Sequence, residues 1–296
     1  MKDLAGKVAF ITGGASGIGF GTAQECIAAG MRVVIADIRP EQLEEARAAL
    51  GSRAHAIVLD VADRERMRLA AEETVSVFGK VHVLFNNAGL GLLGSICDAT
   101  YNDWDWMLSV NLNAVFNGVR SFLPHLRAHG EGAHIVSTAS MGGLMVTGNG
   151  GVYSTCKFGV VAMMQCLRDD LAPEGIGVSV LCPAAVNTNI YTHDELRPEK
   201  FGNSGHVQSP EARERLKTLL AGGMDPRRVG TVVLDGIRRN APYLFTHNMA
   251  AVLQERCKAL LASLPDEPVN QERLAADLQA REYMKLRLSG RGPRSP

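Results

Sequence analysis

The sequence predicts an α/β fold in which helices cover both faces of a doubly wound parallel sheet. Short apolar runs recur along the chain without strict polar alternation, which is the pattern of strands buried on both faces. Longer segments of helical period separate these runs, and repeated strand–helix units give parallel sheets with right-handed crossovers. At 296 residues the chain is long enough for one large core, and we expect a single domain of this class over residues 1–248.

The predicted elements follow from these two patterns: apolar runs indicate strands, and segments of helical period indicate helices. The apolar runs interpreted as strands are residues 8–11, 33–36, 56–61, 81–85, 134–137, 178–181 and 243–246. The segments interpreted as the helices between them are residues 19–29, 40–50, 63–78, 100–127, 153–171 and 226–239. Thr100 and Asp103 have the spacing of a capping-box variant, so they mark the start of the fourth helix.

Three segments depart from this alternation. Residues 187–225 are rich in charge, glycine and proline, with one short helical pattern at 210–220, and we expect a mobile lid over a site. A fixed surface excursion is the alternative interpretation. Helical patterns at 249–263 and 271–286 predict a helical C-terminal extension over residues 249–288. The composition of residues 289–296 predicts a disordered tail.

The composition excludes several classes of function. The 31 basic and 31 acidic side chains balance, so there is no basic field for nucleic acid or an anionic membrane surface. Six cysteines without a C-x-x-C pair predict reduced thiols rather than a disulfide framework or a metal site. The chain shows neither a signal-peptide pattern nor an apolar run long enough to cross a bilayer, and we expect a cytoplasmic protein.

A glycine-rich turn, TGGASGIG at residues 12–19, follows the first predicted strand and opens the first predicted helix. Backbone N–H groups in such a turn face a pyrophosphate. Asp37 ends the second strand, where a carboxylate binds a ribose hydroxyl pair and repels a 2′-phosphate, so we expect NAD rather than NADP. Arg39 could partly offset that repulsion, but we interpret it as an exposed loop arginine. Residues 60–61 and 86–89 end the third and fourth strands at the ligand-binding edge of the sheet.

Tyr153 and Lys157 stand four positions apart and share one face of a predicted helix. A tyrosine is a poor base at neutral pH, and we expect the ammonium of Lys157 to lower its pKa. Ser140 follows an apolar run and would lie at a strand end. Alone, a Tyr-x-x-x-Lys pair is more often a solvated helix face, but here it occurs together with the nucleotide-binding motifs.

These motifs resemble the short-chain dehydrogenase/reductase family from about residue 7 to residue 188, in the family's order. Residues 12–19 are similar to its T-G-x-x-x-G-x-G turn and residues 86–89 to its N-N-A-G, whereas Pro183 and Ala184 stand where the family usually has Pro-Gly. The resemblance implies a Rossmann fold and a catalytic tetrad of Asn111, Ser140, Tyr153 and Lys157. It implies a cofactor site made of Gly13, Ser16, Gly17, Ile18, Gly19, Asp37, Asp60, Val61, Asn87, Ala88, Gly89, Tyr153, Lys157, Val186 and Thr188.

The resemblance also implies a reaction. Tyr153 would take the proton of a secondary alcohol while the cofactor takes the hydride, and Ser140 would hold the substrate oxygen. Lys157 would also reach the nicotinamide ribose, and Asn111 would anchor a water. Without the resemblance, Asn111 is a buried, locally bonded helix asparagine. An epimerase or dehydratase acting on an NAD-bound intermediate, and a sensor without catalysis, remain alternative functions.

A narrower resemblance concerns the substrate. The opening residues 1–3, the glycine-rich turn, residues 196–202 and the long C-terminal extension are similar to bacterial dehydrogenases that oxidise the benzylic carbinol of lignin-derived aryl ethers. We therefore expect a bulky hydrophobic aryl, terpenoid or steroid alcohol or ketone. The apolar residues expected to form its wall are Leu90, Leu92, Met141, Leu144, Met145 and Tyr191. The resemblance also implies a homodimer or homotetramer that pairs through the helices at 100–127 and 153–171.

Overall fold

The computed structural model describes residues 1–146, 148–206 and 209–289. Its centre is one sheet of seven strands in the order β3-β2-β1-β4-β5-β6-β7, and every neighbouring pair is parallel. The strands are β1 (Val8–Thr12), β2 (Arg32–Asp37), β3 (Ala54–Val58), β4 (Val83–Asn86), β5 (Ala133–Thr138), β6 (Ile176–Cys182) and β7 (Tyr243–Phe245). The predicted doubly wound α/β class is confirmed.

The strand order reverses between β1 and β4, because β2 and β3 extend the sheet to one side and β4 to β7 to the other. Diverging connections leave a crevice outside the carboxyl ends of these two strands, where open α/β sheets bind ligands. Both strands are fully buried along their length. The hydrophobic core therefore fixes the position of this crevice.

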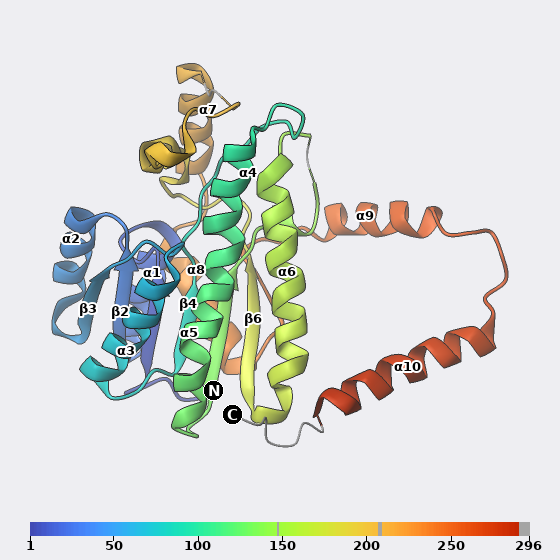
Figure 1. The fold of residues 1–296 in the computed structure, drawn as a ribbon, viewed down its shortest axis with the longest axis horizontal. Helices are drawn as coiled ribbons and strands as arrows, with labels where there is room; N and C mark the ends of the chain where they lie inside the picture. The colour runs from blue at the N-terminus through green and yellow to red at the C-terminus, as the bar shows by residue number, and fades with distance from the viewer. Residues whose placement is uncertain (147, 207–208, 290–296) are drawn as a thin grey trace.

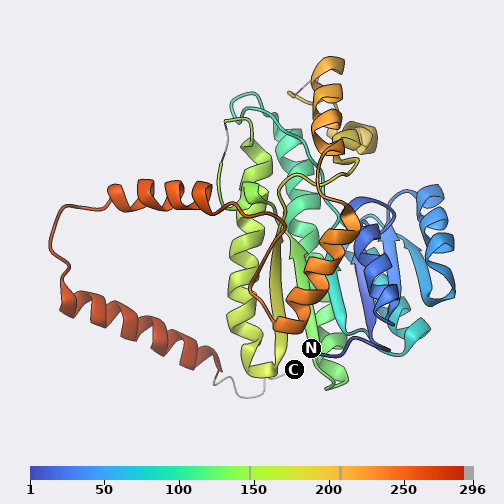
Figure 2. The ribbon, with the colours of Figure 1, turned by 180° about the vertical axis from the view of Figure 1, so that it is seen from behind.

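Helices cover the two faces of the sheet in separate layers (Figures 1 and 2). One face is covered by α3 (Arg64–Phe78), α4 (Tyr101–Leu108), α5 (Ala114–Ala128) and α6 (Gly151–Leu171), and the other by α1 (Gly17–Ala28), α2 (Pro40–Leu50) and α8 (Pro226–Arg239). Short 3₁₀ turns join some elements: η1 (Gly51–Arg53), η3 (Met141–Gly143) and η4 (Ala172–Glu174).

Side-chain caps mark the beginnings of several helices. Asp63 accepts hydrogen bonds from the backbone of Glu65 and Arg66 at the start of α3, and Asp225 caps α8 in the same way. Thr100 and Asp103 form the expected capping box at the start of α4. These caps satisfy N–H groups that no helical carbonyl can reach.

Two predicted elements differ from the structure. The segment 100–127 is not one regular helix, because the π-helical turn η2 (Ser109–Asn113) separates α4 from α5. The strand predicted at 56–61 is β3 at 54–58, so Asp60 and Val61 lie in the loop after it. Both differences lie at the carboxyl edge of the sheet, where side chains leave the regular hydrogen-bond pattern to form a site.

The segment expected to be a lid rises above the carboxyl edge of the sheet, beside α4 (Figure 1). It contains η5 (Ile190–Leu196), η6 (Glu199–Phe201) and α7 (Pro210–Ala221). No residue of α7 is buried, whereas Leu196 and Phe201 pack against a core cluster around Trp106. The part of the segment before α7 is thus anchored to the body by apolar contacts that the sequence did not indicate.

The C-terminal extension is an arm of two helices, α9 (Ala250–Ala262) and α10 (Gln271–Ser289), that projects from the side of the body where α6 lies (Figures 1 and 2). The Arg256 guanidinium carbon lies 4.8 Å from the centre of the Phe158 ring of α6, and Leu253 packs against the main core cluster. The base of α9 is therefore docked on α6. Apart from Ser289, the tail predicted to be disordered lies outside the described residues.

None of the helices in the described ranges combines the length and the apolar character that a bilayer crossing requires. All six cysteines are free thiols, as the sequence predicted.

Candidate active site

A cavity of about 430 Å³ opens at the crevice between β1 and β4. Its lining comes from the carboxyl ends of the central strands, the glycine-rich turn, α4, α6 and the lid segment. The expected cofactor residues that line it are Gly13, Ser16, Gly17, Ile18, Asp37, Asp60, Val61, Asn87, Ala88, Gly89, Tyr153, Lys157, Val186 and Thr188. Gly19 is absent from this lining.

The N-terminus of α1 faces the cavity with its backbone N–H groups uncapped. Ser16 occupies the cap position but makes no side-chain capping bond, and the first turn holds no acidic residue. Such a terminus is suited to a pyrophosphate. Gly19 contributes by packing, because a β-carbon there would lie 2.1 Å from the carbonyl oxygen of Gly13. Its lack of a side chain lets α1 approach the turn that precedes it.

Asp37 lines the cavity at the carboxyl end of β2, and Arg39 donates hydrogen bonds to both of its carboxylate oxygens. Arg39 Nε lies 3.0 Å from Oδ1, and Arg39 Nη2 lies 3.2 Å from Oδ2 and 3.0 Å from the Ser16 hydroxyl oxygen. The interpretation of Arg39 as an exposed loop arginine is therefore wrong. The reason is geometric, since a side chain two residues beyond a strand end can fold back over the carboxylate of that strand. Arg39 therefore offsets part of the negative charge that Asp37 brings to the cavity.

Hydrogen bonds fix the loop after β4 to both neighbouring strands. The Thr12 hydroxyl accepts from the backbone N–H groups of Asn87 and Ala88, at 2.9 Å and 3.0 Å. The Asn87 amide donates to the Thr12 carbonyl at 3.1 Å and accepts from the Thr138 hydroxyl at 3.1 Å. This network holds the Asn-Asn-Ala-Gly segment against the carboxyl ends of β1 and β5.

Ser140, Tyr153 and Lys157 meet at the middle of the cavity. Ser140 follows β5 and accepts a hydrogen bond from the N–H of Gly142, whereas Tyr153 and Lys157 come from the first turns of α6. The Lys157 ammonium donates to the carbonyl oxygen of Thr138 at 3.0 Å and lies 5.6 Å from the centre of the Tyr153 ring. The side chain that follows β5 and the two side chains on α6 thus line one cavity.

The pKa values of this pair differ from the expectation. Burial raises the pKa of Tyr153 above its ordinary value, and a hydrogen bond with Ser140 offsets only part of that rise. Burial also lowers the pKa of Lys157 to about 8, because removal from water disfavours the charged ammonium. The expected lowering of the tyrosine pKa by Lys157 is therefore not the dominant effect here. Desolvation has the largest effect on the pKa of each of the two groups.

Asn111 lies in the π-helical turn η2, outside the cavity lining, and is buried. Its side-chain oxygen accepts from the N–H of Leu90 at 2.8 Å, and its side-chain nitrogen donates to the Leu90 carbonyl at 3.0 Å. A β-carbon at Gly89 would lie 2.8 Å from that oxygen, so the glycine permits this approach. The side-chain nitrogen also donates to the Met107 sulfur at 3.6 Å, so the asparagine is bonded both locally and to Leu90, and it is not among the residues that line the cavity. Single-turn π-helical insertions are frequent at functional sites.

The remaining wall of the cavity differs from the one expected for the substrate. Of the proposed apolar residues, Leu90 lines the cavity, whereas Leu92 and Met141 are buried in the core and Leu144 and Met145 pack against it. The apolar and aromatic residues that the sequence analysis did not assign to this wall are Trp106, Val110, Ile190, Leu196, Phe201 and Leu220. Of these, Leu196 and Phe201 belong to the lid segment, and their packing against the cluster around Trp106 is a tertiary feature that the sequence does not show.

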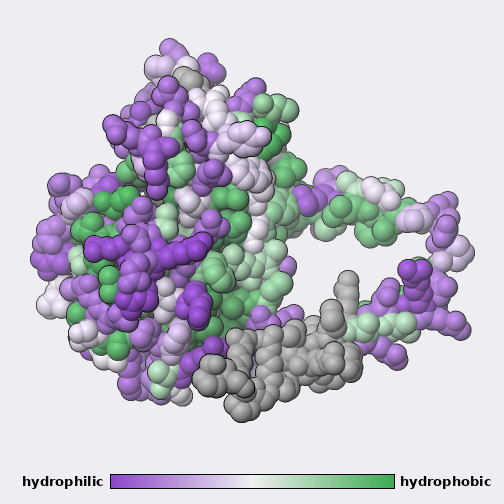
Figure 3. Space-filling model, in the orientation of Figure 1, coloured by the Kyte–Doolittle hydropathy of each residue, from purple (hydrophilic) through white to green (hydrophobic). Residues whose placement is uncertain are grey.

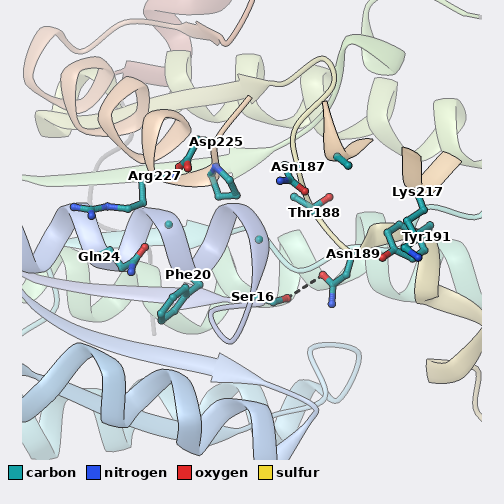
Figure 4. Close-up of a pocket in the computed structure, with 14 residues that line it drawn as sticks. Ser16, Phe20, Gln24, Asn187, Thr188, Asn189, Tyr191, Lys217, Asp225 and Arg227 are labelled. Atoms are coloured by element: carbon teal, nitrogen blue, oxygen red, sulfur yellow. Dashed lines mark hydrogen bonds between the residues drawn. The ribbon is translucent and has the colours of Figure 1, made fainter. Parts of the chain in front are cut away.

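A second cavity of about 560 Å³, shown in Figure 4, adjoins the first and shares lining residues with it. It contains Tyr191, which the sequence analysis assigned to the substrate wall, near Lys217 of α7. Ser16 and Asn189 line both cavities and are joined by a hydrogen bond of 3.3 Å. The glycine-rich turn and residues 187–189 therefore form a partition between the two cavities.

One cluster in the described part of the chain has metal-ligand side chains: His82, His129 and Glu131. The Nδ1 atoms of the two histidines accept from backbone N–H groups of Val8 and Glu131, and their Nε2 atoms bond to Glu131 and to the Val81 carbonyl. Lys7 also pairs with Glu131. Every ring nitrogen already has a partner, so the cluster fits a structural hydrogen-bond network.

The comparison with protein families identifies the chain's relatives. The sequence model of a family described as short chain dehydrogenase matches residues 7–198, which include the whole tetrad and the strands that position it. The chain belongs to this family. The dehydrogenase is accordingly an oxidoreductase that uses a nicotinamide cofactor and acts on a small molecule.

Individual relatives match most of the dehydrogenase. It is 40% identical over 269 residues to the C alpha-dehydrogenase of Sphingobium sp. SYK-6, covering 89% of this chain and 88% of that one. It is 34% identical over 191 residues to 3beta-hydroxysteroid dehydrogenase 2 of Eggerthella lenta, covering 63% and 74%. A short chain dehydrogenase/reductase of Burkholderia phymatum, solved in complex with NAD, is 33% identical with a TM-score of 0.84, covering 91% and 100%.

Proposed function

We propose that the dehydrogenase interconverts a secondary benzylic alcohol and the corresponding ketone of a bulky aryl substrate, with NAD. The observation that carries this proposal is that Ser140, Tyr153 and Lys157 line one cavity together with the aromatic side chains of Trp106 and Phe201. The 40% identity to a C alpha-dehydrogenase supports the aryl class.

The proposed chemistry divides between the cofactor and three side chains. When bound, the nicotinamide ring exchanges a hydride with the carbinol carbon. Tyr153 moves the proton at the substrate oxygen, as a base in alcohol oxidation and as an acid in ketone reduction. Ser140 holds that oxygen. Lys157 is held by its hydrogen bond to the Thr138 carbonyl oxygen. In its protonated form, the lysine places a positive charge beside the tyrosine ring.

Asn111 has a different role in this proposal. Both polar atoms of its amide bind the backbone of Leu90, which lines the cavity. We assign it to positioning of this wall rather than to contact with substrate. Residues 12–19 and the uncapped start of α1 would hold the pyrophosphate, and Asp37 the adenosine ribose.

The choice of NAD over NADP depends on Asp37, which would accept hydrogen bonds from ribose hydroxyls and repel a 2′-phosphate. The bidentate pair with Arg39 reduces that repulsion. The carboxylate nevertheless occupies the place next to Ala15 at the glycine-rich turn, where its Oδ2 accepts from the Ala15 N–H at 3.3 Å. The 2′-phosphate of NADP would bring a second anion close to this carboxylate, so we expect NAD to bind more tightly.

A direct assay tests the proposed function. The protein is incubated with NAD and a panel of secondary alcohols (benzylic carbinols of aryl ethers, steroid alcohols and small aliphatic alcohols), and NADH formation is followed. We expect the highest kcat/KM for the benzylic carbinols. A steroid preference would contradict the substrate class. Conversion of substrate without net NADH would favour an epimerase or dehydratase, and binding of NAD without any conversion would favour a sensor.

We further propose a homodimer or homotetramer. Phe116 of α5 is 56% exposed, and Leu260 and Leu261 of α9 are also exposed. In Figure 3 apolar residues gather along α9 and on the part of the body beside it. Light scattering at micromolar concentration should show an oligomer that Phe116→Glu weakens. Leu219→Glu, on the exposed surface of α7, is the control. A monomeric unmodified protein contradicts this proposal.

A further inference from the structure

Asp103 is a fully buried carboxylate whose contacts exceed what a helix cap requires. Its Oδ2 accepts from the N–H and hydroxyl of Thr100 at 2.9 Å and 2.8 Å, which completes the capping box of α4. Three further donors come from the lid segment: Arg197 Nη1 at 2.8 Å, the Ser204 hydroxyl at 2.7 Å and the Gly205 N–H at 2.9 Å. One carboxylate thus ties the lid segment to the start of α4.

Arg197, the partner of Asp103, makes further contacts that hold the lid segment in place. Its Nε donates to the Gly202 carbonyl at 2.7 Å and its Nη2 to the Phe201 carbonyl at 2.9 Å, so one guanidinium fixes the turn over residues 197–202. Its carbon Cζ lies 4.9 Å from the centre of the Trp106 ring. The side chain is only 10% exposed, so this ion pair is shielded from salt and water.

The ionisation of Asp103 agrees with this geometry. Burial alone would raise the pKa of its carboxyl group, but hydrogen bonds from Ser204, Thr100 and Gly205 together outweigh burial and hold the pKa well below its usual range. The carboxylate is therefore charged at every pH at which the enzyme would be assayed. A buried charge that lost its partner would be costly, so the connection favours one arrangement of the segment.

The residues held by this pair form the substrate end of the cavity. Trp106, Leu196 and Phe201 line it, and the Trp106 and Phe201 rings lie 6.5 Å apart. By contrast, α7 contributes Leu220 to the lining but has no buried residue, and its Arg213 pairs with Glu195 in an exposed ion pair. Within one lid, the half before residue 207 is anchored and α7 is not.

We propose that the Asp103–Arg197 pair is a specificity-determining positioning pair that holds residues 196–205 as a preformed aromatic wall for bulky substrates. This inference rests on the proposed function. It divides the lid expected from the sequence into a fixed wall and a separate helix. Neither residue lines the cavity, so both act through Trp106, Leu196 and Phe201.

Arg197→Lys tests the pair, because it keeps the charge opposite Asp103 but removes the forked bonds to Phe201 and Gly202. For a bulky benzylic alcohol we expect KM to rise about 10- to 100-fold, the range for lost packing in an apolar pocket. For a small secondary alcohol such as 2-propanol, KM should stay within about threefold, and kcat should change little for either substrate. Arg213→Lys makes the same change in the exposed ion pair and should leave both substrates unaffected.

Hydrogen exchange gives a readout that does not depend on activity. In Arg197→Lys without ligands, amides over residues 196–205 should exchange faster, whereas those of α7 should not change. Equal KM changes for bulky and small alcohols, or unaltered exchange over 196–205, would overturn the inference. If the unmodified protein oxidised no alcohol, the proposed function would fail, while the exchange measurement would still decide whether the pair holds this segment.

Discussion

Tyr153→Phe should reduce turnover by about 10²–10⁴-fold, the usual contribution of a positioned proton-transfer group. The substitution removes only the phenolic oxygen and leaves the ring, which is packed beside Ser140 and Gly142, where a glycine β-carbon would lie 3.3 Å from the tyrosine ring. Steady-state kinetics with a benzylic alcohol measure turnover, and calorimetric titration with NAD should show unchanged affinity. Activity within tenfold of the unmodified enzyme would remove Tyr153 from the proposed mechanism.

A matched control is available in Tyr191→Phe. The same atom is deleted from a tyrosine that lines the neighbouring cavity rather than the proposed active site (Figure 4). We expect its turnover to stay within about threefold of the unmodified enzyme, because it removes no proton-transfer group. An equal loss of turnover in Tyr153→Phe and Tyr191→Phe would indicate an indirect effect through the lid segment rather than the loss of a proton-transfer group.

The raised pKa of Tyr153 sets the sign of the pH dependence. Alcohol oxidation requires the deprotonated tyrosine, so its rate should increase as pH rises toward the alkaline range. Ketone reduction requires the protonated tyrosine and should decrease over the same range. Because the pKa of Lys157 is lowered to about 8, its ammonium is lost in this range and ceases to assist the phenolate. In Tyr153→Phe, the residual rate of alcohol oxidation should no longer rise with pH, and the residual rate of ketone reduction should no longer fall.

Asp37→Ala should change cofactor selectivity by about 10- to 100-fold in kcat/KM. A hydrogen bond to a charged group contributes about 1.5–3 kcal/mol, which corresponds to this range. NAD should bind more weakly because its ribose loses the carboxylate, and NADP more tightly because Arg39 is freed from Asp37 to meet a 2′-phosphate. Kinetics with both cofactors and one alcohol measure the ratio.

The double variant Asp37→Ala/Arg39→Ala separates the two contributions. If Arg39 supplies the new affinity for NADP, the double variant should lose that gain while binding NAD about as weakly as the single variant. An unmodified enzyme that used NADP as well as NAD would contradict the assignment of Asp37, since the carboxylate then would not discriminate between them. Asp60→Asn, at the loop after β3, is a control for loss of charge elsewhere in the cavity.

The sequence determined the features that local rules specify. Buried strands such as β1 and β6 are short apolar runs, and the periods of the helices between them are regular, so the parallel sheet follows from pattern alone. The strand order, and with it the switch point between β1 and β4, came from the structure. The glycine-rich turn, Asp37 and the residues from Ser140 to Lys157 follow strand ends or begin helices. Their convergence is a consequence of topology, because carboxyl ends of parallel strands meet at one edge.

Only the tertiary structure decided how groups from distant segments balance one another. The pKa of Tyr153 depends on burial that no spacing reveals, and Arg39 binds Asp37 because its side chain folds back across the strand end. The capping box of α4 was visible in the sequence, but its acid also holds Arg197, 94 residues away. The local sequence determines which hydrogen bonds and ion pairs a side chain is able to form, whereas the packing of the whole chain determines which partner it meets.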